Sequence, residues 1–326
     1  MREAMAAAEV GDDVLDGDPT VRRLEEAAAA WLGKERALFV PSGTMANQVA
    51  VGTWTQPGDE ILVQRWAHVT TFESGAAGYL HGVQSMSLGD RSGHLDPEEV
   101  RGALRPDFLH CPRTALVCLE QTHNAAGGVV LPMDEVAGVA AVARERDIPV
   151  HLDGARLANA VVASGISASE WCGHADSVSL CFSKGLGAPV GSVIAGEGAF
   201  IERAVLLRKR LGGWMRQAGH MAAAALLGLE HGVERLAEDH VLARSIAERL
   251  GALDGLSADP SSTDTNIVMV EVGAEGHDAA SLSAALAEHG VRVMPMGERV
   301  LRFVTHRDVG PEDVERLEAA ARAALR

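Results

Sequence analysis

The sequence predicts an α/β fold built on a mostly parallel sheet, with one large domain and one small domain. Through most of the 326 residues, short apolar runs alternate with amphipathic segments of helical period. Strands that are separated by helices in this way form parallel sheets with helices on both faces. The length and a hydrophobic content of 47% allow a large core and more than one domain.

The expected elements follow one another in a regular order. Each expected strand is a short run rich in apolar residues, and each expected helix repeats its apolar residues at a helical period. We place a large domain with an N-terminal helical segment at residues 1–240 and a small C-terminal α/β domain at residues 241–326. The expected strands are residues 37–40, 60–63, 84–88, 115–119, 148–152, 177–182, 192–195, 266–270, 291–294 and 300–304, and the expected helices are residues 44–54, 69–79, 97–104, 133–146, 156–164, 199–211, 217–253, 279–289 and 311–325.

The charge balance argues against nucleic acid as a partner. The chain has 29 Lys and Arg residues against 45 Asp and Glu residues, and a net charge of −16 repels a polyphosphate backbone. It has no apolar run of about 18 residues and no signal-peptide pattern, so we expect no membrane contact and a cytoplasmic location. The four cysteines lack CxxC spacing, and we expect them to be structural.

Lys184 is the most informative residue of the chain. It follows the apolar run that ends at Phe182, and Asp153 precedes it by one expected helix and one expected strand. Pyridoxal phosphate (PLP) requires such a pair, because a lysine amine binds its aldehyde and a carboxylate keeps its ring nitrogen protonated. A solvated lysine is the alternative, but Lys184 lies between an apolar strand and a glycine-rich turn. The pair therefore predicts PLP as the cofactor.

The Ser42-Gly43-Thr44 turn is the expected phosphate site. It ends a strand and opens a helix, so its backbone N–H groups and hydroxyls can bind a phosphate at the helix N-terminus. An ordinary helix cap is the alternative. Because parallel strands end at one edge of a sheet, this turn, Asp153 and Lys184 are expected to lie together.

Two histidines follow expected strands and are candidates for the same site. His68 begins a helix, where its flat ring could lie over the pyridine ring of the cofactor, whereas a capping or surface histidine is the alternative. His123 could act as a general base on a substrate hydroxyl, whereas a loop histidine bonded to the backbone is the alternative. A metal site built from these histidines with His151 and Asp153 lacks tight ligand spacing, so no metal is expected.

Two arginines and a basic cluster complete the candidates. Arg156 follows Asp153 by one turn and could reach the phenolic oxygen of the cofactor, or form a salt bridge on its helix. Arg302 is a charge inside an apolar strand and could bind a carboxylate through its planar fork, or extend into solvent from an edge strand. The basic cluster at residues 203–216 is either a solvated helix face or a phosphate-binding group.

Together these segments resemble the threonine aldolase family of fold-type I PLP enzymes, which have the aspartate aminotransferase-like transferase fold. The resemblance covers nearly the whole chain, in residues 9–14, 18–20, 41–48, 122–124, 151–156, 182–189, 215–219 and 302–306. It implies cofactor contacts from Ser42, Gly43, Thr44, His68, Asp153, Arg156 and Lys184, contacts to the phosphate of a neighbouring subunit from Lys209 and Arg216, and substrate contacts from His123, Arg156 and Arg302.

The reaction implied by this resemblance is a retro-aldol cleavage in amino acid metabolism. L-Threonine or L-allo-threonine is split into glycine and acetaldehyde, and His123, directly or through a water, takes the proton of the β-hydroxyl. Shared sites imply a homo-oligomer, either a dimer or a homotetramer. A β-eliminating lyase of the same cofactor class is the alternative, in which a β-substituent leaves.

Three departures from the family pattern bear on this expectation. The Ser-Asp-Thr segment that precedes the first helix in the family is absent from this sequence, and its serine helps to bind the substrate carboxylate. Leu15 and Trp214 also stand where the family tends to have tyrosine and glycine. A PLP-binding protein with impaired activity is therefore a further alternative.

Overall fold

The computed structural model describes all residues from Met1 to Arg326, and the chain divides into two compact units. The first unit contains Met1–Ala126 and Leu131–Val233, and the second contains Gly127–Val130 and Glu234–Arg326. The division thus falls before the boundary at residues 240 and 241 that the sequence predicts. The reason is that helix α12 (Leu236–Gly251) already belongs to the second unit, where the Asp239 carbonyl accepts a 2.6 Å hydrogen bond from Thr305 Oγ1.

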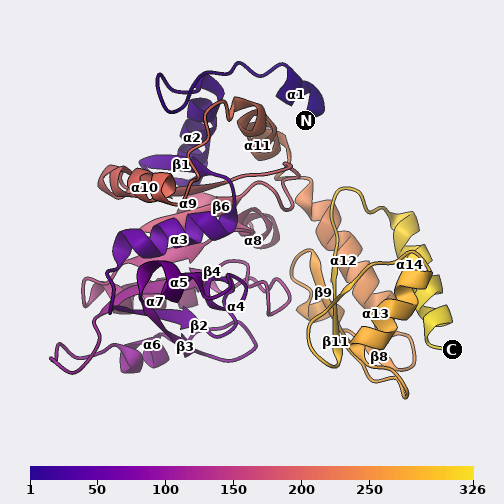
Figure 1. Ribbon diagram of the computed structural model, residues 1–326. Helices are drawn as coiled ribbons and strands as arrows, with labels where there is room; N and C mark the ends of the chain where they lie inside the picture. Colours follow the sequence, from indigo (N-terminus) through magenta and orange to yellow (C-terminus); the bar gives the residue numbers. More distant parts are fainter. The chain divides into compact units, whose positions relative to one another are not determined.

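The first unit contains a seven-stranded sheet in the order β1-β7-β6-β5-β4-β2-β3. All neighbouring strands are parallel except at β7, which runs antiparallel to β1 and β6 (Figure 1). The predicted mostly parallel α/β sheet is therefore confirmed. Its strands are β1 (Arg36–Val40), β2 (Glu60–Gln64), β3 (Gln84–Leu88), β4 (Thr114–Glu120), β5 (Val150–Asp153), β6 (Ser177–Cys181) and β7 (Ser192–Gly196).

Burial explains why these strands read as continuous apolar runs. Every residue of β2, β4, β5, β6 and β7 is buried, as expected for a parallel sheet covered on both faces. Only β3, at the edge, exposes much of its length. The helices of this unit lie on both faces of the sheet (Figure 1). They are α1 (Arg2–Ala6), α2 (Pro19–Leu32), α3 (Gly43–Trp54), α4 (His68–Thr71), α5 (Ala76–His81), α6 (Pro97–Ala103), α7 (Met133–Arg144), α8 (Leu157–Ser164), α9 (Ala168–Cys172), α10 (Gly198–Arg210) and α11 (Gly219–His231).

Two helices that the sequence predicts as continuous are each divided. In place of a helix over residues 69–79, α4 ends at Thr71, and Ser74 and Gly75 adopt φ values of 54° and 71°. This left-handed conformation cannot continue an α-helix. In place of a helix over residues 217–253, α11 and α12 are separated at residues 232–235, where Gly232 has low helix propensity. The apolar period alone did not reveal either break.

The second unit has its own sheet and core. Its sheet has the order β10-β11-β9-β8, with every pair antiparallel. Alternate residues of β9 and β11 pack with α12, α13 and α14 in one cluster of buried side chains. None of the helices in the chain combines the length and the apolar composition that a membrane span requires. The elements are β8 (Leu256–Ser257), β9 (Ile267–Val272), β10 (Met294–Pro295), β11 (Val300–Val304), η1 (Pro260–Ser262), α13 (Ala279–Glu288) and α14 (Pro311–Ala324).

Candidate active site

The carboxyl edge of the large sheet carries most of the residues that the sequence predicts for the site. Asp153 is the last residue of β5, and Lys184 lies in the turn that follows β6. Ser42 follows β1, His68 follows β2, and His123 follows β4. Ligands of open α/β sheets bind at this edge, beyond the ends of the strands.

Asp153 is a buried carboxylate that remains ionised. Its Oδ2 accepts a 2.7 Å hydrogen bond from Asn47 Nδ2, and its Oδ1 accepts one of 3.0 Å from the Ala155 backbone. Burial by itself raises the pKa of Asp153, but the charges of Lys184 and His68 and the Asn47 hydrogen bond outweigh it, so the pKa lies below its usual value. The half-buried Lys184 amine therefore lies within the electrostatic reach of an anionic partner.

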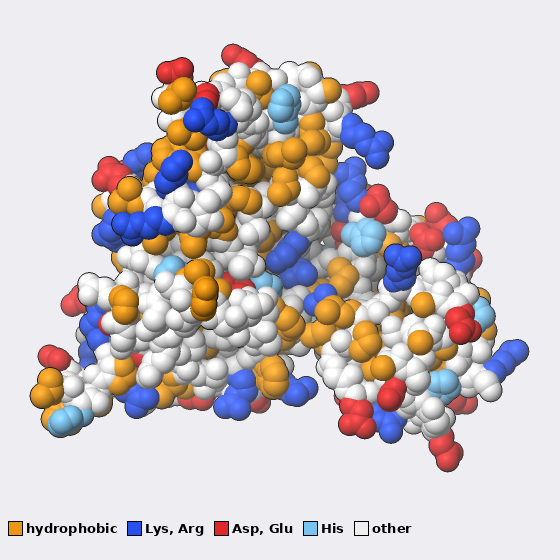
Figure 2. Space-filling view, in the orientation of Figure 1, with side chains coloured by type: hydrophobic (Ala, Val, Ile, Leu, Met, Phe, Trp, Pro, Cys, Tyr) orange, Lys and Arg blue, Asp and Glu red, His pale blue; other side chains and the backbone are white.

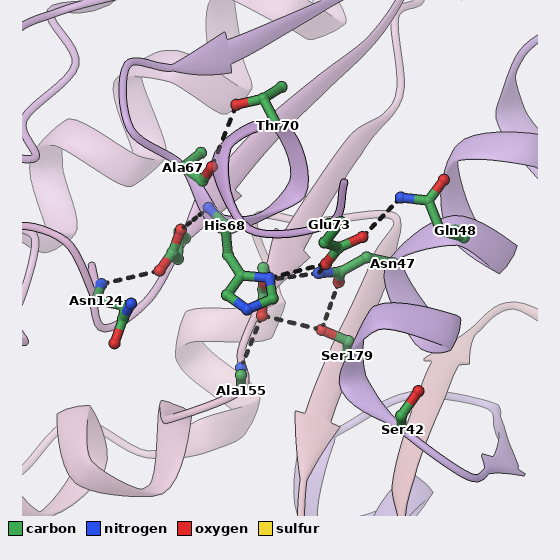
Figure 3. A network of polar contacts seen from close by, with 12 residues as sticks. Ser42, Asn47, Gln48, Ala67, His68, Thr70, Glu73, Asn124, Ala155 and Ser179 are labelled. Atoms are coloured by element: carbon green, nitrogen blue, oxygen red, sulfur yellow. Dashed lines mark hydrogen bonds and ion pairs between the residues drawn. The ribbon is translucent and has the colours of Figure 1, made fainter. Parts of the chain in front are cut away.

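Asn47 joins Asp153 to a second buried carboxylate. The same Nδ2 group that binds Asp153 also donates to Glu73 Oε1 at 2.8 Å, and His68 Nδ1 lies 2.9 Å from that oxygen (Figure 3). The other oxygen of Glu73 accepts from Gln48 Nε2 at 2.6 Å. Glu73 thus fixes the His68 ring, because the ring donates from Nδ1 and leaves Nε2 on its other side.

The charge of His68 follows from these neighbours. Burial by itself lowers the pKa of His68. The hydrogen bond to Glu73 and the charges of Asp153, Glu73 and Glu120 raise it by more than burial lowers it, so the pKa lies above its usual value. A ring that is held flat and carries positive charge can stack on an aromatic ligand and stabilise negative charge there. The His68 side chain is 25% exposed, and its ring is paired with the fully buried carboxylate of Glu73.

His123 has the opposite character. It is fully buried, and its Nδ1 accepts a 3.2 Å hydrogen bond from the Ala126 backbone. The neutral ring therefore carries its proton on Nε2, which is buried and has no hydrogen-bond partner. In this tautomer Nε2 donates. His123 can therefore accept a proton only at Nδ1, and only when Nδ1 releases the backbone N–H group of Ala126.

Burial also predicts the protonation state of His123. Burial lowers the pKa of His123 to about 4, with Asp153 opposing this shift and His94 adding to it. The ring is then neutral above about pH 5, whereas His68 keeps its proton to a pH above 6.5. An NMR titration of the two Cε1–H signals in the cofactor-free protein should show pKa values displaced in opposite directions from 6.5, with the signals assigned from His68→Gln and His123→Gln variants. A His123 pKa between about 6 and 7 would contradict this geometry.

The phosphate candidate lies at the N-terminus of α3. Ser42 caps the helix, and its Oγ accepts a 3.2 Å hydrogen bond from Met45 N. The capping alternative is thus present, and it is compatible with phosphate binding because the first N–H groups of a helix have no partner within the helix. A Cβ on Gly43 would lie 2.5 Å from Cys181 Sγ, so glycine lets the start of α3 approach the end of β6.

Three other predicted residues have different surroundings. Arg156 lies at the start of α8, and its charge lowers the pKa of Cys181 against the larger effect of burial. Lys209 Nζ lies 5.7 Å from the centroid of the Trp214 ring. Arg216 is 59% exposed and pairs with Asp12 at 2.5 Å. A role of Lys209 and Arg216 at the phosphate of a neighbouring subunit therefore stays a prediction.

Arg302 belongs to the second unit. It lies in β11, between β10 and β9, opposite Met294 on one side and Met269 on the other. The edge-strand alternative is therefore wrong. Burial lowers the pKa of Arg302, and its side chain lies on the face opposite the buried Leu301 and Phe303. Its role at a substrate carboxylate stays a prediction.

The sequence interpretation missed the polar residues that hold the predicted ones in place. Asn47 lies one helical turn after Gly43, and Glu120 is a polar residue at the end of an apolar strand, as Asp153 is. These two positions, near the carboxyl ends of strands, could have indicated from the sequence that Asn47 and Glu120 belong to the site. No such position marks Glu73 in the sequence, because it lies in the connection between two short helices, α4 and α5, and not at the end of a strand. Ser179, whose Oγ donates to Asn47 Oδ1 at 3.0 Å, lies inside an apolar strand and could not be distinguished from a packed serine.

The comparison with protein families decides where this site belongs. The family description of beta-eliminating lyases matches residues 1–274. The chain belongs to the beta-eliminating lyase family. It is 42% identical to the low specificity L-threonine aldolase of Escherichia coli (strain K12), over all of this chain and 95% of the relative. The resemblance to the threonine aldolase family is thus confirmed.

Solved structures confirm the fold of this beta-eliminating lyase family member. A putative aromatic amino acid beta-eliminating lyase/threonine aldolase from Exiguobacterium sp. 255-15 has a TM-score of 0.84 at 25% identity, over 99% of this chain and 92% of that one. A serine palmitoyltransferase from Sphingomonas wittichii has a TM-score of 0.74 at 21% identity, over 99% of this chain and 82% of that one. The similarity to the serine palmitoyltransferase concerns the fold alone. It agrees with the predicted fold type I.

Proposed function

We propose that this chain is a PLP-dependent carbon–carbon lyase that cleaves L-threonine or L-allo-threonine into glycine and acetaldehyde. The observation that carries the proposal is the buried Asp153 at the carboxyl edge of the sheet, whose pKa is lowered by the charges of Lys184 and His68. The name of the E. coli relative supports the reaction and the substrate class. When bound, PLP supplies an electron sink for the pair of electrons that the broken Cα–Cβ bond releases.

The residues present fit this cofactor. A buried carboxylate with a lowered pKa calls for a cationic partner, which Asp153 would find in a protonated ring nitrogen. Lys184 offers the amine for the aldehyde, and Ser42, Gly43 and Thr44 offer a phosphate site at the start of α3. The His68 ring, fixed through Nδ1, would lie against the cofactor ring. Arg156 would reach the phenolic oxygen and the substrate.

The chain's own groups would also orient the substrate and handle its proton. Arg302 would bind the carboxylate through two parallel N–H donors, which fixes the amino acid so that one bond at Cα is placed for cleavage. The Nε2–H group of His123 would donate to the oxygen of the β-hydroxyl. The proton of that hydroxyl would pass through a water to Nδ1 of His123, which must first release the backbone N–H group of Ala126. Burial of His123 excludes bulk solvent from that step.

The Arg302→Lys variant should separate substrate binding from cofactor binding. Lysine keeps the charge but loses the bidentate geometry, so we expect KM for L-threonine to rise roughly 10-fold to 100-fold while the cofactor absorbance is unchanged. Steady-state kinetics of the PLP-loaded protein measure the effect. Arg299→Lys is the matched control, since Arg299 donates to the backbone carbonyls of Val272 and His277 in the same unit. An unchanged KM would remove Arg302 from the substrate site.

The proposed reaction has one competitor that a specific observation favours. The family description is that of beta-eliminating lyases, whose reaction loses a β-substituent and leaves the Cα–Cβ bond intact. Incubating the PLP-loaded protein with L-threonine and L-allo-threonine in parallel, and assaying acetaldehyde and glycine, tests the aldolase. Release of ammonia and a 2-oxo acid without glycine would assign β-elimination instead. Cofactor absorbance without any product would leave a PLP-binding protein with impaired activity.

We further propose that the protein is a homo-oligomer, either a dimer or a tetramer, in which Lys209 and Arg216 reach the phosphate of a neighbouring subunit. A cavity of about 400 Å³ between α1, α2 and α11 is lined mainly by alanine and leucine. Apolar side chains gather over α11 on the surface shown in Figure 2. Leu15 is 71% exposed. Apolar surface of this kind is typical of subunit contacts, and sedimentation equilibrium measures the assembly.

We also propose a cytoplasmic location for the enzyme. All four cysteines are free, and three of them are buried. Unpaired thiols are typical of proteins from reducing compartments. Fractionation of the source cells, with detection of the protein by antibody, tests the location.

A further inference from the structure

Glu120 is a buried carboxylate to which the reaction assigns no role. It is the last residue of β4 and is only 4% exposed. Its Oε2 accepts a 2.7 Å hydrogen bond from the backbone N–H of His68, and its Oε1 accepts one of 2.8 Å from that of Asn124 (Figure 3). One carboxylate therefore joins two segments that follow different strands, β2 and β4.

Each of these segments carries one of the two histidines of the site. His68 is itself one of the donors, and His123 directly precedes the other donor, Asn124. The rings have separate restraints, at Glu73 for His68 and at the Ala126 backbone for His123. Glu120 thus holds the backbone of both segments, while Glu73 and the Ala126 backbone hold the two rings. These four contacts together set the distance and orientation between the two imidazole rings.

The chemistry of the contact explains why a carboxylate is needed. Burial and the charge of Asp153 raise the pKa of Glu120 to about 7, so ionisation of Glu120 costs free energy that the two backbone hydrogen bonds and the charge of His68 partly offset. A carboxylate nevertheless offers two acceptors to two N–H donors at once. A glutamine offers one acceptor and places an NH₂ group against the other N–H group. A serine or threonine is too short to bridge both segments.

We propose that Glu120 is a positioning residue that sets the spacing of His68 and His123 and thereby the preference between the two epimers at the β-carbon. This inference rests on the proposed aldolase function. L-Threonine and L-allo-threonine differ only in which side of Cβ carries the hydroxyl and which carries the methyl group. The positions of the two imidazoles decide which of these sides is polar, so a change in their spacing changes the ratio of the two rates.

The test uses Glu120→Gln in the PLP-loaded protein, with Glu60→Gln as the matched control. Glu60 is another buried glutamate, 1% exposed, at the other end of β2 and paired with Arg105. Hydrogen exchange measured by mass spectrometry on peptides covering residues 65–72 and 121–126 reports the two contacts. We expect Glu120→Gln to accelerate exchange roughly 10-fold in at least one of these peptides, and Glu60→Gln to leave both unchanged.

Kinetics supply the second measurement. The ratio of kcat/KM for L-allo-threonine to that for L-threonine should change by about 3-fold or more in Glu120→Gln, with the cofactor absorbance retained. Equal losses for both epimers, or unchanged exchange in both peptides, would overturn the inference. If Glu120→Gln fails to fold, Glu120→Asp decides, because it keeps both acceptors on a shorter stem and should shift the ratio in a folded protein.

The two proposals fail in different ways. If the wild-type protein cleaves neither epimer, the proposed function fails, whereas the exchange of the two peptides still decides whether Glu120 joins their segments. If the wild-type protein is an aldolase and the epimer ratio is the same in all Glu120 variants, only the role of Glu120 fails.

Discussion

Lys184→Ala is expected to abolish the absorbance of lysine-bound PLP and to lower acetaldehyde release by at least about 1,000-fold. The reason is that no other amine is placed beside Asp153. The chain's other lysines are Lys34, which donates to the Ala175 carbonyl, and Lys209, which lies over Trp214. Absorbance spectra and product assays of the purified variant with added PLP measure both effects.

Lys34→Ala is the matched control for this experiment. Lys34 is partly buried, and its carbonyl partner lies before β6, at the end of that strand opposite Lys184. We expect its replacement to lower stability modestly and to leave the cofactor absorbance unchanged. Retention of lysine-bound PLP in Lys184→Ala, or its loss in Lys34→Ala, would contradict the assignment.

Asp153→Asn should have the second largest effect. The change removes the buried charge that would hold a protonated ring nitrogen, and it places an amide in a position where Asn47 Nδ2 donates. We expect kcat to fall roughly 100-fold to 1,000-fold, which corresponds to a loss of about 3–4 kcal/mol of transition-state stabilisation. The pKa of His68 should fall as well, because Asp153 is one of the groups that raise it. Single-turnover kinetics and the His68 NMR titration measure the two effects.

Asp176→Asn is the control for the loss of an aspartate. Asp176 accepts a 2.7 Å hydrogen bond from Val150 N, at the first residue of the strand that ends in Asp153. It lies at the amino edge of the sheet and is exposed. A kcat loss in Asp176→Asn as large as that in Asp153→Asn would show that the effect comes from the sheet and not from the site.

Much of the site could be predicted because its residues lie where strands end. Asp153, Lys184 and Ser42 each follow an apolar run, and the parallel sheet brings such positions to one edge. Local signals were also sufficient at α2, where Asp18 caps the helix, Pro19 begins it and Gly33 ends it with φ of 63°. These features depend on residues that are close in sequence.

The remaining features depend on contacts between residues far apart in the chain. Asn47 binds Asp153 across 106 positions, and Glu120 binds His68 across 52. The tautomer of His123 follows from one backbone N–H group, at Ala126. No local pattern encodes these partners, because a buried amide or carboxylate looks the same in sequence whichever donor it meets.

By itself, the sequence determined the order of the elements, the α/β class, and the lysine and aspartate that a PLP site requires. Hydrophobic period and residue chemistry are local properties, so they can be recognised in the sequence without knowledge of the fold. Only the tertiary structure decided that β7 runs antiparallel, that residues 69–79 are not one helix, and that Glu73 and Glu120 hold the two histidines. Those features depend on which distant groups form hydrogen bonds with each buried polar atom. These partners are determined only when the chain packs into its tertiary structure.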